Sequence, residues 1–407
     1  MTLNSWREKY ESLVPRLTGL ARAMPLTLCG LATCTDAYLR LAEAEPLFSA
    51  RNGKAASLAR TLQLRAANGI GGELFVPWPE AEDWIAENLR PSSWGLGGTG
   101  AQAAQALTVL GAQALISLED RSSRQLSVIH PDVLIATGQG LERRGGVRES
   151  GSSKPAHYIF EFNSGELIGG QRAKRSTRVI VRFADDRLDR DIAFVRESIS
   201  RANAAGAAVI CGFNEIAEES LGDELEYTKS LLSAWQDEGL PAIHLELGGY
   251  EDASLRDQVL AALGPMITSL GMSHSELREF GSDNVAAAAA KLRADFSLKR
   301  ICIHADDWAF AITQEDPERE FESLISGCLL AACRASDGKV SVPTQVPKGA
   351  EFHDPPYPPI SRQNGLFLVC CASPYLERPN ATIGLGDTFL AGTLLGHQAR
   401  QLTVENT

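Results

Sequence analysis

The stretch NATIGLGDTF, residues 380–389, places two glycines and a carboxylate just before an apolar, helix-like run. Gly384, Leu385, Gly386 and Asp387 could form an ordinary turn, because glycine and aspartate are common loop and helix-cap residues. Free amides at a helix start can equally hold a phosphate, and a carboxylate there can take a proton from a hydroxyl. These four residues are therefore candidates for the anion hole and the base of a phosphoryl-transfer site.

Further candidate residues lie near the ends of apolar runs. Asp36 follows LTLCGLAT (26–33), and at the end of a first strand it could accept two sugar hydroxyls or cap a helix. Gly97, Gly98 and Thr99 precede an Ala-rich helical segment. Their spacing does not meet the GxGxxG dinucleotide pattern, so a close approach of the backbone to a small ligand is at least as good an interpretation.

Two glutamates are candidate metal ligands. In IHLEL, His244 and Glu246 are two residues apart and should share one side of a strand end, as a metal pair or as a salt-bridged terminus. Glu276, in LGMSHSELREF, lies in a predicted strand-to-helix connection, where it could cap the helix or bind magnesium through water.

A cluster of basic residues, QRAKRSTRVIVRF, stands out in an acidic chain. Lys174 and Arg175 are typical of a solvated edge. Arg178 and Arg182 lie in an otherwise apolar strand and on the same face of it. Inward-facing arginines need an anion, either protein-borne or bound. We predict a phosphate contact for Arg182.

The order of apolar segments indicates how these residues are positioned. Short runs of the buried-strand type, such as AAVICGF (207–213), PAIHLEL (241–247) and LFLVCCA (366–372), alternate with segments of helical length. This alternation is typical of an α/β protein with a mostly parallel sheet covered on both faces. Functional residues of such sheets lie at the carboxyl ends of the strands.

Two regions interrupt the alternation and predict a second, smaller lobe. Residues 38–93 are helical and irregular, and residues 140–178 are rich in Gly, Ser and Arg. We therefore expect a large domain made of 1–37, 94–139 and 179–407, and a small domain made of 38–93 and 140–178.

Composition limits the classes of function. The chain of 407 residues has 39 basic and 51 acidic residues, a net charge of −12, which argues against a nucleic-acid partner. The N-terminus is polar, and we find no uninterrupted apolar run of membrane-spanning length. We therefore expect a cytoplasmic protein without membrane contact. The eight scattered cysteines, without a CxxC pair, predict buried free thiols.

The order of these motifs resembles the ADP-dependent glucokinase and phosphofructokinase family, a branch of the ribokinase-like kinases. The resemblance rests on TDAY, GGTGAQAAQAL, HYIFEF, RVIVRF, VICGFNEI, IHLEL, LGMSHSEL, ICIHADDWAFAIT and ATIGLGDTF, and covers roughly residues 24–397. It implies a ribokinase-like three-layer sandwich with an inserted α+β lid domain, acting as a monomer or small homo-oligomer.

The resemblance also implies roles. Asp387 matches the catalytic base and the turn before it the anion hole, with Arg182 assisting. Glu246 and Glu276 match the residues that organise Mg²⁺, with ADP as phosphoryl donor. Asp36, Gly97 and Gly98 match sugar-contacting positions, to which we add Thr99 and Arg178 as substrate contacts.

Departures from the family pattern leave the acceptor open. Ser57 stands where glucokinases have a glutamate, Asn163 and Ser164 where phosphofructokinases have a basic residue, and Ser273 where an Asn or Asp is usual. We expect a sugar or sugar phosphate as the acceptor. The alternatives are an ATP-dependent kinase or a kinase of nucleosides or other small alcohols, and a non-catalytic binding relative.

Overall fold

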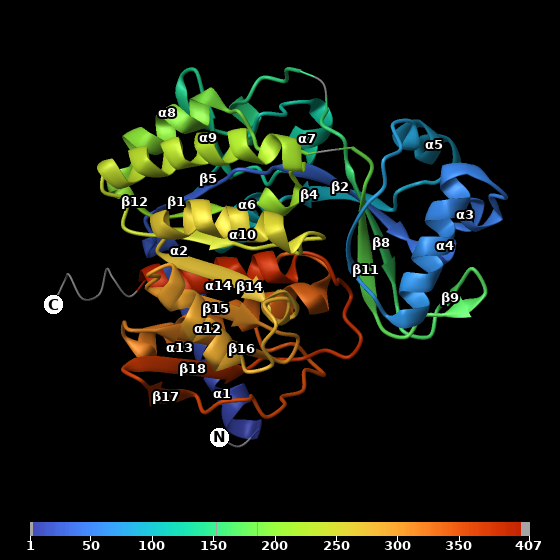
Figure 1. Cartoon of the computed structure of the whole chain (residues 1–407). Helices are drawn as coiled ribbons and strands as arrows, with labels where there is room; N and C mark the ends of the chain where they lie inside the picture. The colour runs from blue at the N-terminus through green and yellow to red at the C-terminus, as the bar shows by residue number, and fades with distance from the viewer. Residues whose placement is uncertain (1–2, 152, 185, 400–407) are drawn as a thin grey trace.

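The computed structural model describes residues 3–151, 153–184 and 186–399, so the outermost residues of the predicted large domain, 1–2 and 400–407, lie outside the described part. Within that part, an 11-stranded sheet and a 5-stranded sheet lie side by side (Figure 1). A small hairpin of β9 (Leu167–Ile168) and β10 (Gln171–Arg172) projects from the smaller lobe.

The large sheet is parallel in its centre and antiparallel at both edges. Its strand order is β17-β18-β16-β15-β14-β13-β12-β1-β5-β6-β7, and the strands from β15 to β6 run parallel. The bounds are β1 (Leu26–Cys29), β5 (Ala114–Ile116), β6 (Leu134–Thr137), β7 (Gly140–Arg143), β12 (Ala205–Ile210), β13 (Ile243–Glu246), β14 (Ser269–Ser273), β15 (Arg300–His304), β16 (Trp308–Thr313), β17 (Ile360–Gln363) and β18 (Leu366–Ala372).

Helices cover both faces of this sheet, which gives three layers. Along β15, Ile301 and Ile303 pack into one core and Cys302 into the other, because successive strand residues point to opposite faces. The first core is shared with α8 (Ile192–Ser200), α9 (Glu218–Asp237), α10 (Ala253–Leu263) and α12 (Val285–Asp295). The second is shared with α1 (Leu3–Leu13), α2 (Leu17–Ala23), α6 (Thr99–Leu110), α7 (Ser123–Val128), α13 (Pro317–Asp337) and α14 (Leu385–Ala399).

The small sheet has one apolar face and one polar face. Its order is β3 (Gly72–Phe75), β11 (Thr177–Arg182), β8 (His157–Phe162), β2 (Cys34–Arg40) and β4 (Ser93–Gly97). Phe160 and Val181 pack in a third core against α3 (Glu45–Ser49), α4 (Gly53–Asn68) and α5 (Ala81–Asn88), on the side away from the large sheet (Figure 1). Alternation turns Glu161 and Arg178, which are paired across β8 and β11, toward the large sheet.

The predicted alternation of strands and helices is confirmed, with local corrections. The run 26–33 is not one strand: β1 ends at Cys29, and β2 begins at Cys34 in the other sheet. Asp36 therefore lies within β2 and does not end the first strand. The strand β16 and the long helix α13 were not predicted.

Strand pairing also shifts the expected domain limits. Residues 34–37, 94–97 and 179–182 belong to strands of the small sheet, and 140–143 form β7 of the large one. β7 is an edge strand whose side chains are at most half-buried, so its sequence has the composition of a surface lobe. Composition changes at the expected limits, whereas the chain passes from one sheet to the other a few residues away.

Candidate active site

A tight turn leads into α14 at the carboxyl-end edge of the large sheet. Gly384 has φ +69°, in the left-handed region that favours glycine, and a Cβ there would collide with the guanidinium of Arg334. α14 starts at Leu385, so Asp387 lies in its first turn, where the backbone amides are not used by the helix. This is the geometry of an anion-binding helix start with a carboxylate beside it.

Asp387 is enclosed by charged and polar groups from three elements. Burial raises the pKa of its carboxyl group, while Arg334, a hydrogen bond with Thr99, and Arg178 oppose that rise. Thr99 begins α6, directly after Gly98, whose φ of +86° lets the chain turn close to Ala32. A raised pKa makes a carboxylate a stronger base than an exposed one.

Arg334 is a site residue that sequence reasoning missed. It lies in α13 and is 7% exposed. Its Nη1 donates to Thr388 Oγ1 at 3.0 Å and its Nη2 to Gln102 Oε1 at 2.5 Å, which holds the guanidinium under the turn. The available signal was a charged side chain inside an apolar helical run.

The two predicted arginines of β11 have different surroundings. Among the described residues the Nε of Arg178 has no hydrogen-bond partner, and burial lowers the pKa of its guanidinium, against the charges of Asp387 and Asp306. Arg182 donates from Nη1 to the carbonyl of Glu215 at 3.0 Å, and its Nε lies 3.8 Å from Glu73 Oε2. Arg182 thus has a protein-borne partner, and its phosphate contact stays a prediction.

Asp36 lies on the polar face of the small sheet. It is 3% exposed, and burial raises its pKa to about 6, against the charge of His157. Gly97, on the neighbouring strand β4, has no room for a Cβ because the Asp36 carboxylate and the Cys34 thiol occupy that space. Charge interaction between Asp36 and Asp387 indicates that the two carboxylates belong to one region.

Glu246 and Glu276 form the predicted acidic pair at the ends of β13 and β14. Burial would raise the pKa of Glu246, but hydrogen bonds from His244 and His304 lower it to about 2; His244 Nε2 lies 2.8 Å from Glu246 Oε2. Glu276 closes a capping box with Ser273 at the start of α11 (His274–Arg278), and burial raises its pKa to about 7. The structure thus shows Glu276 as a helix cap. Its use as a metal ligand stays a prediction, which the same carboxylate could also fulfil.

These two carboxyl groups fit a magnesium ion. The Glu246 charge is one of the interactions that raise the pKa of Glu276, so a cation between them would relieve that repulsion. Carboxylate oxygens with added water are what Mg²⁺ prefers.

A second group of metal-ligand types lies where the two sheets meet. His157 Nε2 is 2.8 Å from Asp186 Oδ2, and its Nδ1 is 3.5 Å from Cys34 Sγ and 3.9 Å from Glu215 Oε1. Burial would lower the pKa of His157, but Cys34, Glu215 and Asp186 hold it well above the ordinary value. These groups satisfy one another as an internal ion-pair cluster. All eight cysteines are buried and free, as predicted.

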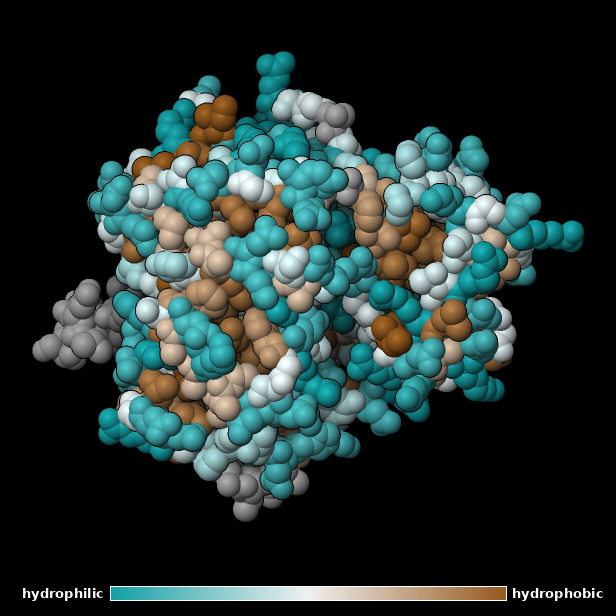
Figure 2. Space-filling model, in the orientation of Figure 1, coloured by the Kyte–Doolittle hydropathy of each residue, from teal (hydrophilic) through white to brown (hydrophobic). Residues whose placement is uncertain are grey.

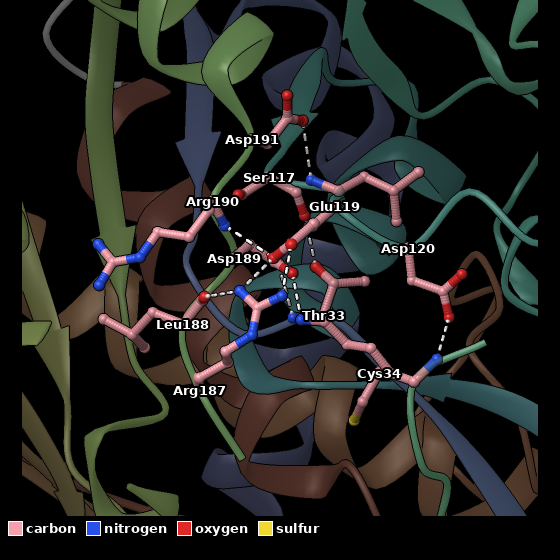
Figure 3. A network of polar contacts seen from close by, with 12 residues as sticks. Thr33, Cys34, Ser117, Glu119, Asp120, Arg187, Leu188, Asp189, Arg190 and Asp191 are labelled. Atoms are coloured by element: carbon pink, nitrogen blue, oxygen red, sulfur yellow. Dashed lines mark hydrogen bonds and ion pairs between the residues drawn. The ribbon is translucent and has the colours of Figure 1, made fainter. Parts of the chain in front are cut away.

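Hydrogen bonds and ion pairs join the segments that connect the two sheets. Asp189 accepts from the Thr33 amide at 3.1 Å, and Arg187 forms a two-bond ion pair with Glu119 (Figure 3). Asp189 also accepts from Lys154 Nζ at 2.5 Å. Thr33, Lys154 and Asp189 each belong to a different connection between the sheets. Figure 2 shows a hollow between the two lobes, with hydrophilic residues at its edges.

Ser57, Asn163 and Ser164, which depart from the family pattern, lie at the periphery, whereas Ser273 caps α11 beside Glu276. Ser57 is exposed on α4. Asn163 and Ser164 form a turn after β8, in which the Asn163 amide donates to Glu166 Oε2 at 2.8 Å and that of Ser164 to Ser176 Oγ at 3.1 Å. Neither segment contributes a charge to the surroundings of Asp387.

Known proteins share both sequence and fold with this chain. The family model described as the ADP-specific phosphofructokinase/glucokinase conserved region matches residues 53–293. The ADP-dependent glucose/glucosamine kinase of Pyrococcus furiosus is 25% identical over 279 residues, 59% of this chain and 60% of that protein. The ADP-specific phosphofructokinase of the same organism is 25% identical over 187 residues, 38% of this chain and 41% of that protein. The chain thus spans less than two thirds of the length of these relatives.

Solved structures extend the fold similarity to nearly the whole chain. An ADP-dependent kinase in complex with fructose-6-phosphate and ADPβS has a TM-score of 0.81 at 15% identity, covering 98% of this chain and 99% of that one. The last common ancestor of ADP-dependent phosphofructokinases from Methanosarcinales has a TM-score of 0.74 at 16% identity, with the same coverage. The predicted fold class is confirmed. In the described ranges no helix is long and apolar enough to cross a membrane.

Proposed function

Because the chain belongs to the ADP-specific phosphofructokinase/glucokinase family, we propose that it is an ADP-dependent kinase that transfers the β-phosphoryl group of ADP to a hydroxyl of a sugar or sugar phosphate. The observation that carries this proposal is the Gly384 turn, which sets Asp387 in the first turn of α14 between Arg334 and Arg178. The names of the relatives support the donor and the class of acceptor.

Catalysis of phosphoryl transfer depends mainly on how the protein groups are positioned and charged. The transferring phosphoryl group passes through a loose, charge-rich transition state. The amides of Leu385, Gly386 and Asp387 would face that charge. Arg178, whose Nε has no hydrogen-bond partner in the described part of the chain, would reach it from the lid. Asp387 would orient the acceptor hydroxyl and take its proton, for which its raised pKa is suited.

Magnesium would be held by Glu246 and Glu276, and when bound it would supply positive charge to the diphosphate. The chain itself prepares the two carboxylates. His244 and His304 hold Glu246 ionised, and the Ser273 amide donates to Glu276 Oε2 at 2.6 Å, which fixes the side chain. Approach of the small sheet to the large one would exclude water from the reacting groups.

For the acceptor we propose a phosphorylated sugar in preference to free glucose. Asp36 and the Gly97–Gly98 backbone would contact sugar hydroxyls. Arg178 and Arg182, on one face of β11, would add positive charge for a phosphate. Ser57 is exposed and lacks the carboxylate that glucokinases have at that position, which further disfavours glucose.

A panel of purified protein with Mg²⁺, ADP or ATP, and sugars or sugar phosphates tests this proposal. We expect AMP release with ADP and a sugar phosphate, and less turnover with ATP. Equal or better turnover with ATP would favour the ATP-dependent alternative. Glucose turning over as well as every sugar phosphate would overturn the acceptor assignment. Binding of ADP or sugar without turnover under any condition would indicate a non-catalytic relative.

A further inference from the structure

Arg334 is a buried arginine whose charge is not neutralised by an ion pair. It lies in α13, is 7% exposed, and forms no ion pair with a carboxylate of the described part of the chain. Arg300 is buried to the same degree, but both carboxylate oxygens of Glu320 lie 2.9 Å from its Nε. Burial of an unpaired charge is destabilising. Stability of the fold therefore does not account for the charge of Arg334.

The guanidinium of Arg334 joins three helices at the turn before α14. Its Nη1 donates to Thr388 Oγ1 of α14 at 3.0 Å, and its Nη2 donates to Gln102 Oε1 of α6 at 2.5 Å. The Thr388 hydroxyl in turn donates to the Gly384 carbonyl at 2.8 Å. Thr388 and Gln102 are both buried, so water does not compete for these contacts. The turn that carries Asp387 is thus supported by the Arg334 side chain.

The backbone beside Arg334 supports the same segment. The amides of Asn380 and Ala381 donate to the Ala335 carbonyl at 2.7 and 3.3 Å, and Asn380 Nδ2 donates to the Ser336 carbonyl at 2.5 Å. These carbonyls belong to the last turn of α13, where the helix itself leaves acceptors free. The end of α13 therefore holds the chain that leads into the turn, from residue 380 to residue 384.

Arg334 also places a positive charge at the start of α14. The N-terminus of a helix already carries partial positive charge, so a cation is disfavoured there and an anion is favoured. Burial raises the pKa of Asp387, and the charge of Arg334 is the interaction that most strongly opposes this rise. The unfavourable position of the cation is thus offset by the negative charge of Asp387 and by any phosphate bound at the turn.

Other charged and titratable groups face Asp387 from the neighbouring elements. They are Arg178 of β11, His304 of β15, Glu246 of β13, Asp36 and Tyr38 of β2, and Cys211 directly after β12. Arg178 favours the ionised form of Asp387, as Arg334 does, whereas Glu246 and Asp36 oppose it. Two carboxylates near a third therefore make the charge of Arg334 necessary for a base that is ionised before the reaction.

We propose that Arg334 is a positioning residue for phosphoryl transfer, an inference that rests on the proposed function. Its guanidinium holds the turn before α14 in shape and supplies positive charge beside the Asp387 carboxylate. Lysine would keep this charge, but it lacks the planar fork that reaches Thr388 and Gln102 together. Arg334 acts through these neighbours, because its side chain is enclosed by protein groups.

The pH dependence of kcat tests this inference. The full chain is assayed with ADP, the acceptor of the panel above that has the highest turnover, and Mg²⁺ that saturates at every pH. Arg334→Met should lower the kcat plateau about 10²-fold or more. It should also move the acid limb of the profile up by about one pH unit or more, because Asp387 binds its proton more tightly without the neighbouring cation.

Three further variants separate charge, geometry and stability. Arg334→Lys and Thr388→Val should leave the acid limb at the parental pH and lower the plateau about tenfold, because the charge stays and a supporting hydrogen bond is lost. Arg256→Met is the matched control. Arg256 is 6% exposed and lies in α10, so its loss should lower the melting temperature and leave the acid limb in place.

Absence of turnover in the parent protein would overturn the proposed function and this inference with it. Where the parent is active, an Arg334→Met variant with a parental plateau or an unmoved acid limb overturns the inference alone. An equal movement of the limb in Arg256→Met does the same. If Arg334→Met does not fold, Arg334→Lys and Thr388→Val decide: parental turnover in either overturns the inference, and a lower plateau with an unmoved limb in both supports it.

Discussion

Replacing Asp387 by asparagine should abolish most turnover and leave the fold intact. Asparagine has the same size and caps a helix about as well as aspartate, but it cannot accept the acceptor's proton. Loss of a general base reduces turnover about 10²–10⁴-fold, which corresponds to about 2.7–5.4 kcal/mol of transition-state stabilisation. The neighbouring groups, Thr99 and Arg334, remain in place, so we expect little change in nucleotide affinity.

The stability of this variant follows from the sign of the pKa shift. Burial raises the pKa of Asp387 in the folded protein, although Arg334 opposes that rise. The folded state therefore binds the proton more tightly than the unfolded state. The charged carboxylate destabilises the fold increasingly as pH rises from the ordinary value toward the raised one, and by a constant amount above it. A neutral asparagine avoids this cost, so its melting temperature should equal or exceed that of the parent at pH 7–8, and the difference should vanish below about pH 4.

Turnover and melting temperature should be measured on the same preparations, with Asp252→Asn as the matched control. Asp252 is also a carboxylate at a helix N-terminus, where it accepts from the Ser254 amide, but it is exposed and remote from α14. We expect the control to keep parental turnover. If Asp387→Asn retains more than about a tenth of parental turnover, Asp387 is not the base.

Three further predictions concern the metal pair, the connecting segments and the lid. Because burial raises the pKa of Glu276 to about 7, the Mg²⁺ concentration for half-maximal turnover should rise about tenfold per pH unit below that value and stay level above it; a flat profile would exclude Glu276 as a ligand. Lys154→Met leaves the fully buried Asp189 without its ion-pair partner, so the free energy of unfolding measured in urea should fall by about 3 kcal/mol. Arg187→Ala removes an exposed ion pair and should lower the free energy of unfolding by about 1 kcal/mol or less. Equal losses in the two variants would contradict this prediction. Arg178→Met should lower turnover about 10²-fold or more, and the exposed Arg172→Met should not; a fully active Arg178 variant would remove it from the site.

Local sequence signals were sufficient to predict part of the geometry of the candidate active site. The two-residue spacing of His244 and Glu246 predicted a shared side of a strand end, and their side chains are in contact at 2.8 Å. The Gly-Leu-Gly-Asp sequence predicted a helix start, and α14 begins at Leu385. In each case the participating residues are neighbours in sequence, so backbone geometry alone places them together.

Contacts between distant segments could not be predicted in this way. Arg334 meets the turn before α14 because α13 and α14 pack closely enough for Ser323 Oγ to donate to the Thr393 carbonyl at 2.8 Å, 70 residues away. Thr33 and Asp189, 156 residues apart, meet because two connections between the sheets lie side by side. No periodicity within either segment carries information about its partner.

The polar face of the small sheet could have been predicted from the alternation of residues along its strands. In HYIFEF, Tyr158, Phe160 and Phe162 enter the core while His157 and Glu161 point the other way. In the paired strand the same alternation sets Arg178 opposite Glu161. Charged residues that share this face of two paired strands, such as Glu161 and Arg178, must find partners, and Glu161 does so at Thr382, 3.0 Å away, just before the Gly384 turn. The alternation within these strands of the small sheet therefore predicts that their polar face needs a partner. Which segment supplies that partner, here the turn before α14, is determined only by the fold of the large sheet.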